Sequence, residues 1–159
     1  MSASGSRTAV LGFRPHTGWA AVLGLSGPRD APSIVAKGRV EMATTFESGA
    51  VYHMGQKLPV DEAEALVRSS EETFTAAARA QIASIADELR ARGLEPVASA
   101  VVANPARPLP PLAEILRSHA LVHAAEGRLY RTALLRASEA CAIPPALVPG
   151  EGLPARGGG

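Results

Sequence analysis

Residues 8–25 read TAVLGFRPHTGWAAVLGL, and this stretch decides the fold. Two apolar runs, residues 8–13 and 19–25, flank a short segment that contains Pro15 and Gly18. Proline and glycine are the residues at which a chain most readily reverses its direction, so the stretch predicts a β-hairpin.

The segments that follow extend this hairpin. Residues 26–32, SGPRDAP, are rich in turn residues, and residues 33–43 alternate in part between apolar and polar positions, as a third strand would. Residues 44–59 are predicted to form a long loop that contains His53, for which the sequence indicates no partner. The first part of the chain therefore predicts a three-stranded antiparallel meander.

The pattern then changes from strand to helix. Residues 61–92 place apolar side chains three, four or seven positions apart, and Gly93 stands where a helix commonly ends. Residues 96–103, PVASAVVA, are a short apolar run between turn signals, which is typical of a buried strand.

A second helix and a last strand complete the prediction. Residues 112–142 are expected to form a helix that bends near Ser118 or Gly127, and residues 146–148 a short strand. The order meander, helix, strand, helix and strand predicts an α/β fold in which helices pack on a mixed sheet.

The composition is typical of one globular domain, with 47% hydrophobic and 19% charged residues in a chain of 159. We expect that domain to span residues 8–149, between a disordered segment at residues 1–7 and a flexible glycine-rich tail at residues 150–159. The absence of an apolar run of about 20 residues predicts no membrane partner, and the lack of a signal-peptide pattern predicts a cytoplasmic protein. Cys141 is the one cysteine, which excludes an internal disulfide.

One group of polar residues stands out in the second helix. His119, His123, Glu126 and Tyr130 are spaced by four, three and four positions, so an α-helix stacks them along one face. Alanine and leucine residues continue the same stripe, whereas the neighbouring arginines point elsewhere. We therefore expect the four polar side chains to be turned toward the interior.

Three interpretations of this stripe remain open. The buried groups could form a hydrogen-bond network that braces the sheet, or they could line a catalytic or binding cleft. Alternatively, His119 and His123 could hold a metal ion, with Glu126 one turn further along as an oxygen ligand. The stripe lacks the glutamate that directly follows the first histidine in the zinc-protease pattern, so that activity is excluded.

Three further residues are candidates for a binding site at the end of the predicted sheet. Arg14 ends the first strand and could hold an anionic group or form a surface ion pair. His16 lies in the hairpin turn, from which its side chain could reach a helix. Asn104 directly follows the buried strand, and ligands of α/β sheets tend to bind at such strand ends.

Residues 12–20, GFRPHTGWA, resemble the first hairpin of the Holliday-junction-resolvase branch of the ribonuclease H-like superfamily. In that branch, a strand ending in Gly-hydrophobic-Asp-Pro turns through Thr-Gly-aromatic-Ala. The predicted order of elements over residues 8–149 is also that of ribonuclease H-like domains. The resemblance implies a ribonuclease H-like fold.

The resemblance also implies an active site that this sequence does not reproduce. Nucleases of the superfamily hold two divalent ions with a cluster of carboxylates, and the first carboxylate is the aspartate that ends strand one. Arg14 stands at that position here, and the fourth strand ends in Asn104 rather than in an acidic residue. An arginine adds positive charge where hard cations need anionic oxygens, so the usual two-metal mechanism is not expected.

The sequence thus favours a binding or scaffold module of ribonuclease H-like fold. A first alternative is a hydrolase or divergent nuclease, with His119 or His123 as general acid/base and Glu126 orienting it. A second is a metal-binding protein that uses His119 and His123. The net charge of +1 gives no sign of nucleic-acid binding, which only the fold resemblance suggests. Cofactor, substrate and partner are not assigned, and homo-oligomer formation is left open.

Overall fold

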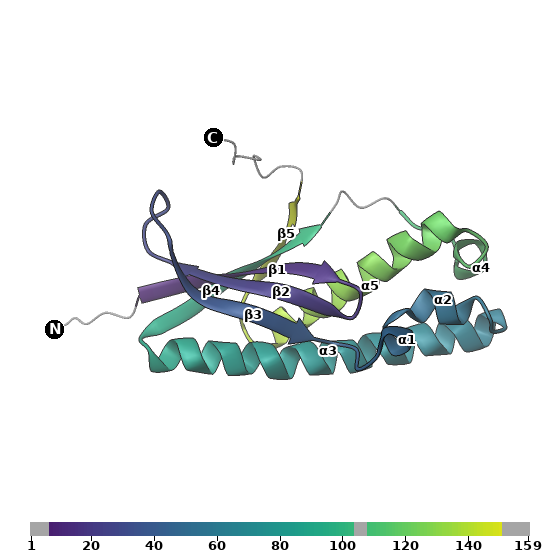
Figure 1. Cartoon of the computed structure of the whole chain (residues 1–159), viewed down its shortest axis with the longest axis horizontal. Helices are drawn as coiled ribbons and strands as arrows, with labels where there is room; N and C mark the ends of the chain where they lie inside the picture. Colours follow the sequence, from purple (N-terminus) through teal and green to yellow (C-terminus); the bar gives the residue numbers. More distant parts are fainter. Residues whose placement is uncertain (1–6, 104–107, 151–159) are drawn as a thin grey trace.

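The computed structural model describes residues 7–103 and 108–150, and Figure 1 shows a twisted sheet with two long helices beside it. The strand order is β3-β2-β1-β4-β5. β2 is antiparallel to both of its neighbours, β1 and β3, whereas β4 and β5 lie parallel to β1. The predicted mixed sheet is confirmed, and so is the predicted order of meander, helix, strand, helix and strand.

The hairpin at the start of the chain forms where the sequence predicts it. β1 (Arg7–His16) pairs with β2 (Trp19–Ser26), and His16 lies opposite Trp19, so Thr17 and Gly18 make the turn. Gly18 has a φ of 87°, a conformation that side-chain-bearing residues rarely adopt. The third strand, β3 (Ser33–Glu41), completes the meander.

The predicted loop at residues 44–59 is wrong in part, because it contains two short helices. These are α1 (Phe46–Gly49) and α2 (Val51–Gly55). Thr45 and Ser48 exchange side-chain and backbone hydrogen bonds in a capping box, and this local signal starts α1.

The first long helix is α3 (Val60–Ala91), and Gly93 follows it with a φ of 76°, as expected of a glycine that ends a helix. The chain then enters β4 (Leu94–Ala103).

The second predicted helix is broken rather than bent. A short α4 (Leu112–Ile115) precedes α5 (His119–Ala140), and β5 (Pro145–Pro149) ends the sheet. Ser118 has extended backbone angles, and its side-chain oxygen accepts a hydrogen bond from Leu121 N at 3.2 Å. Ser118 is therefore the N-cap from which α5 starts.

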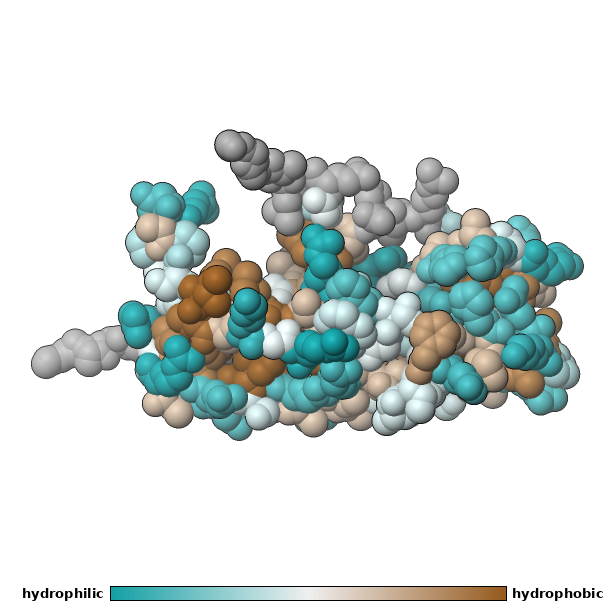
Figure 2. Space-filling model, in the orientation of Figure 1, coloured by the Kyte–Doolittle hydropathy of each residue, from teal (hydrophilic) through white to brown (hydrophobic). Residues whose placement is uncertain are grey.

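The core lies between one face of the sheet and the helices α3 and α5. Alternate residues of the strands, such as Leu11, Phe13 and Val22, are buried on that face. Val10 and Leu23 point to the other face and are exposed, and Figure 2 shows apolar residues gathered over these strands. Within residues 7–103 and 108–150, no helix is long and apolar enough to cross a membrane. The predicted disorder at the two termini concerns residues that, apart from Arg7 and Gly150, lie outside the described ranges.

Candidate metal centre and adjoining cleft

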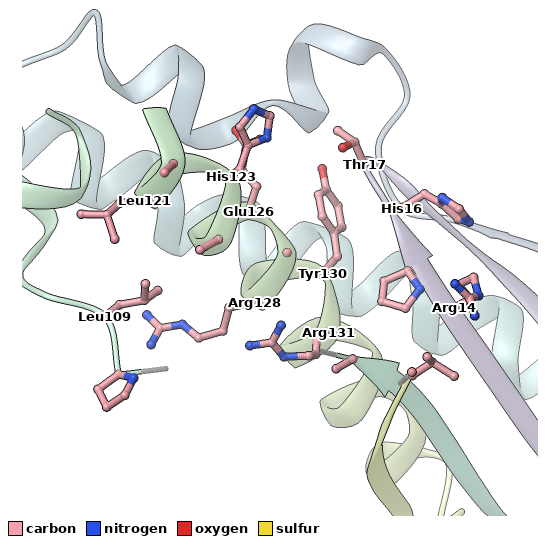
Figure 3. A pocket seen from close by; sticks show the side chains of 18 residues that line it. Arg14, His16, Thr17, Leu109, Leu121, His123, Glu126, Arg128, Tyr130 and Arg131 are labelled. Atoms are coloured by element: carbon pink, nitrogen blue, oxygen red, sulfur yellow. The ribbon is translucent and has the colours of Figure 1, made fainter. Parts of the chain in front are cut away.

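A cleft of about 680 Å³ opens between α5 and the carboxyl ends of β1 and β4. Figure 3 shows α5 forming one wall, with side chains of its first half pointing along or into the cleft. The end of β1 and the segment around Leu109 form the other walls. Ligands of α/β sheets commonly bind at this kind of position.

Two residues of the predicted stripe are buried as expected. Glu126 is 5% exposed and Tyr130 is 1% exposed. The Tyr130 hydroxyl donates a hydrogen bond to Gly49 O, and its ring stacks on Phe74 with centroids 5.0 Å apart. Burial raises the pKa of Tyr130, and the nearby charge of Glu126 raises it further, so the hydroxyl remains a hydrogen-bond donor.

Glu126 fastens the short helix α2 to α5. Its Oε2 accepts hydrogen bonds from the backbone nitrogens of Tyr52 at 3.0 Å and His53 at 3.1 Å. The same oxygen lies 2.9 Å from Nδ1 of His53. A buried carboxylate needs partners of this kind, and here all three come from a segment more than 70 residues away in the sequence.

His119 and His123 are exposed, so the expectation that they face the interior is wrong. Figure 1 shows that the first half of α5 extends beyond the ends of the strands. The stripe is continuous along the helix, but the rest of the protein covers only its later part, which contains Glu126 and Tyr130. The two imidazoles therefore remain at the surface, above the buried Glu126.

The structure brings a third histidine to this pair. His119 Nε2 and His123 Nε2 lie 3.1 Å apart, and the ring of His53 is 5.2 Å from that of His123 and 5.8 Å from that of His119. One ring nitrogen of each of the three residues lies within 4.8 Å of those of the other two. We call His53, His119 and His123 the histidine cluster.

The contact with Glu126 favours a proton on Nδ1 of His53. An ionised carboxylate only accepts hydrogen bonds, so the 2.9 Å contact makes Nδ1 the donor. In the neutral imidazole, Nε2 then carries the lone pair. His53 is therefore held in the tautomer that can bind a metal ion through Nε2.

This finding corrects the role expected of Glu126. Glu126 orients His53 rather than His119 or His123. All three hydrogen bonds described above are made by its Oε2. Its other two partners are the backbone nitrogens of Tyr52 and His53.

Arg14 and His16 lie at the edge of the cleft but are not turned toward α5. The neighbouring Phe13 is buried against the helices, so the alternation of β1 points Arg14 and His16 the other way, as Figure 3 shows. His16 stacks on Trp19, with ring centroids 4.2 Å apart, instead of reaching a helix. Asn104 lies outside the described residues.

Sequence reasoning missed His53 and two arginines, Arg128 and Arg131, that also line the cleft. The capping pattern at residues 45–48 could have predicted a helical segment near His53. No local sequence signal indicates that this segment packs against Glu126 of α5.

No protein-family model matches the chain, and no curated protein matches it. Among solved structures, Thermus thermophilus RuvC in complex with a Holliday junction substrate gives a TM-score of 0.48 at 13% identity, over 91% of this chain and 66% of that one. A second T. thermophilus RuvC structure gives 0.43 at 12% identity, over 89% and 63%. An Aquifex aeolicus member of the Ppx/GppA family gives 0.39 at 11% identity, over 91% and 36%. The chain thus spans less than two thirds of each of these proteins.

Proposed function

We propose that this ribonuclease H-like domain binds one divalent transition metal ion, of the zinc type, through His53, His119 and His123. The observation that carries the proposal is the hydrogen bond between Glu126 and Nδ1 of His53. Histidines that bind metal ions almost always donate their other ring N–H to a carboxylate, a carbonyl or water. In this protein, the buried carboxylate of Glu126 is the corresponding partner of His53.

The spacing of the three residues supports the same conclusion. Nitrogens bound to one tetrahedral zinc ion at 2.0–2.1 Å lie about 3.3 Å from each other. The 3.1 Å separation of His119 and His123 is already close to this value. The other nitrogen–nitrogen distances in the cluster are at most 4.8 Å. They can shorten if the exposed side chains of His119 and His123 rotate, while Glu126 holds His53 in place.

The donor set favours zinc or a similar ion over magnesium. Imidazole suits zinc, copper, nickel and iron, whereas magnesium prefers oxygen ligands. Among the described residues that line the cleft, Glu126 is the one carboxylate, and Arg14 stands where the family resemblance implies a metal-binding aspartate. These residues support a histidine site in place of the two-metal nuclease site.

Metal-assisted hydrolysis is a second candidate function, favoured by the position of His123. This residue belongs to the histidine cluster and also lines the cleft. Three protein ligands leave a fourth position for water, and zinc lowers the pKa of such a water to about 7 in hydrolytic enzymes.

The first test is calorimetric titration of zinc into metal-stripped protein without a histidine tag. We expect one ion per chain, and we expect His53→Ala, His119→Ala and His123→Ala each to weaken binding at least about tenfold. Glu126→Gln keeps the ligands but alters the partner of His53, and should weaken binding about 10- to 100-fold. His16→Ala is the matched control, because His16 lies outside the cluster, and should bind zinc as the unmodified protein does.

Two results would contradict the proposal. One is the absence of zinc binding by a protein whose circular dichroism shows it to be folded, which would favour the binding or scaffold role without metal. The other is equal weakening by His16→Ala and His53→Ala, which would indicate adventitious binding to surface histidines.

A further inference from the structure

The part of the cleft beyond the histidine cluster has a separate chemical character, which the metal proposal does not use. Arg128 and Arg131 both line it, and both come from α5. Figure 3 shows their side chains extending from the helix into the same space, with Arg128 reaching toward Leu109. Residues three positions apart are neighbours on a helix surface, so two positive charges lie next to each other here.

Among residues 7–103 and 108–150, no carboxylate forms an ion pair with Arg128 or Arg131. Within residues 7–103 and 108–150, the ion pairs of the protein involve other arginines, namely Arg39, Arg68, Arg90 and Arg136, and the pair of His53 with Glu126. Glu126 is the one acidic residue among those described in the cleft, and His53 and its backbone neighbours already engage it. The cleft therefore has an excess of positive charge.

Arg131 is half-buried, whereas Arg128 is exposed. Partial burial lowers the pKa of Arg131, and the charge of Arg128 lowers it further. Burial raises the pKa of Tyr52, and the charge of Arg128 partly opposes that increase.

We propose that this cleft binds a small phosphate-bearing molecule, with the phosphate held by Arg128 and Arg131. Guanidinium groups are planar donors that match phosphate oxygens, often in bidentate fashion. Leu109 and Leu121 supply apolar surface in the same cleft, so the ligand also carries an apolar or aromatic group. A volume of about 680 Å³ is in the range of small-molecule sites.

The observations favour a small phosphate ester over a nucleic-acid strand. A strand is held by many phosphate contacts along an extended basic surface. Here the protein carries a net charge of only +1, and the two arginines are confined to one cleft.

The proposal is tested by calorimetric titration of metal-free protein, so that its outcome does not depend on the histidine cluster. The probes are AMP, which joins a phosphate to an aromatic group, together with adenosine, inorganic phosphate and a single-stranded oligonucleotide. We expect AMP to bind and adenosine not to bind. Arg128→Ala and Arg131→Ala should each weaken AMP binding at least about tenfold.

Arg79→Ala is the matched control, since Arg79 is an exposed arginine in α3, outside the cleft. It should bind AMP as the unmodified protein does. The proposal is wrong if AMP and phosphate both fail to bind at about 10 mM, or if the Arg128 and Arg131 variants behave like Arg79→Ala. Tighter binding of the oligonucleotide than of AMP, increasing with its length, would replace the small ligand by a nucleic-acid strand.

Discussion

The two halves of one helical stripe have opposite environments. His119 and His123, in the first two turns of α5, are exposed, whereas Glu126 and Tyr130, one and two turns further on, are buried. The buried pair makes specific hydrogen bonds to the segment that contains α1 and α2. The exposed pair contacts only other histidines through its ring nitrogens, within the described residues. We therefore expect substitutions in the buried half to lower stability more than substitutions in the exposed half, to which we assign the proposed metal site.

The largest effect on stability is expected from Glu126→Ala. This change leaves the buried backbone nitrogens of Tyr52 and His53 without an acceptor, so the free energy of unfolding should fall by about 3 kcal/mol. Urea denaturation measures this value, with Glu139→Ala as an exposed control on the same helix. A loss within the range of the control would mean that the carboxylate does not fasten α2.

Tyr130→Phe should have the next largest effect, about 1 kcal/mol, because it removes the hydrogen bond to Gly49 O. Burial and the nearby charge of Glu126 raise the pKa of Tyr130 in the folded protein above the ordinary tyrosine value of 10.0. The hydroxyl therefore contributes stability that is fully present below pH 10 and is lost as the pH rises further.

The free energy of unfolding, measured by urea denaturation from about pH 9 to about pH 11, tests this dependence around the ordinary tyrosine pKa of 10.0. The unmodified protein should lose more stability over that range than Tyr130→Phe. Parallel losses in the two proteins would contradict the buried hydrogen bond.

Ser118→Ala affects the boundary between α4 and the exposed half of α5. Removing the N-cap oxygen should lower the free energy of unfolding by about 1 kcal/mol and fray the turn that carries His119. Zinc affinity should fall together with stability. Ser84→Ala, an exposed serine of α3, is the control, and an equal effect of the two changes on hydrogen exchange at residues 119–122 would contradict the capping role.

The smallest effect on stability is expected from His119→Ala and His123→Ala. Both side chains are exposed, so each change should alter the stability of the metal-free protein by less than about 0.5 kcal/mol. In saturating zinc, the unmodified protein should gain stability that the variants lack. A large loss in the metal-free state would show that the exposed pair also has a structural role.

Local signals predicted most of the fold. Gly18 and Gly93 adopt the positive φ values that a tight turn and a helix end require, and both positions were predicted from the sequence. The break before α5 was predicted only as a bend near Ser118 or Gly127, because the apolar pattern continues through residues 112–142. Ser118 can continue a helix or cap the start of a new one, and here its side chain caps α5. The apolar pattern does not indicate which of the two occurs.

The candidate site was predictable only in part. Helical spacing placed His119, His123 and Glu126 on one face, and the structure agrees. Spacing does not indicate where the sheet ends, so it assigned the wrong environment to the two histidines. His53 was missed because its contact with Glu126 joins positions 73 residues apart, and such contacts depend on tertiary packing.

The most direct measurement of the metal centre is X-ray absorption at the zinc edge of the zinc-loaded protein. A site made by the histidine cluster predicts three imidazole nitrogens at about 2.0 Å and one oxygen ligand. The spectrum of His53→Ala should show one imidazole fewer. A shell dominated by oxygen, or a His53→Ala spectrum identical to that of the unmodified protein, would contradict the assignment.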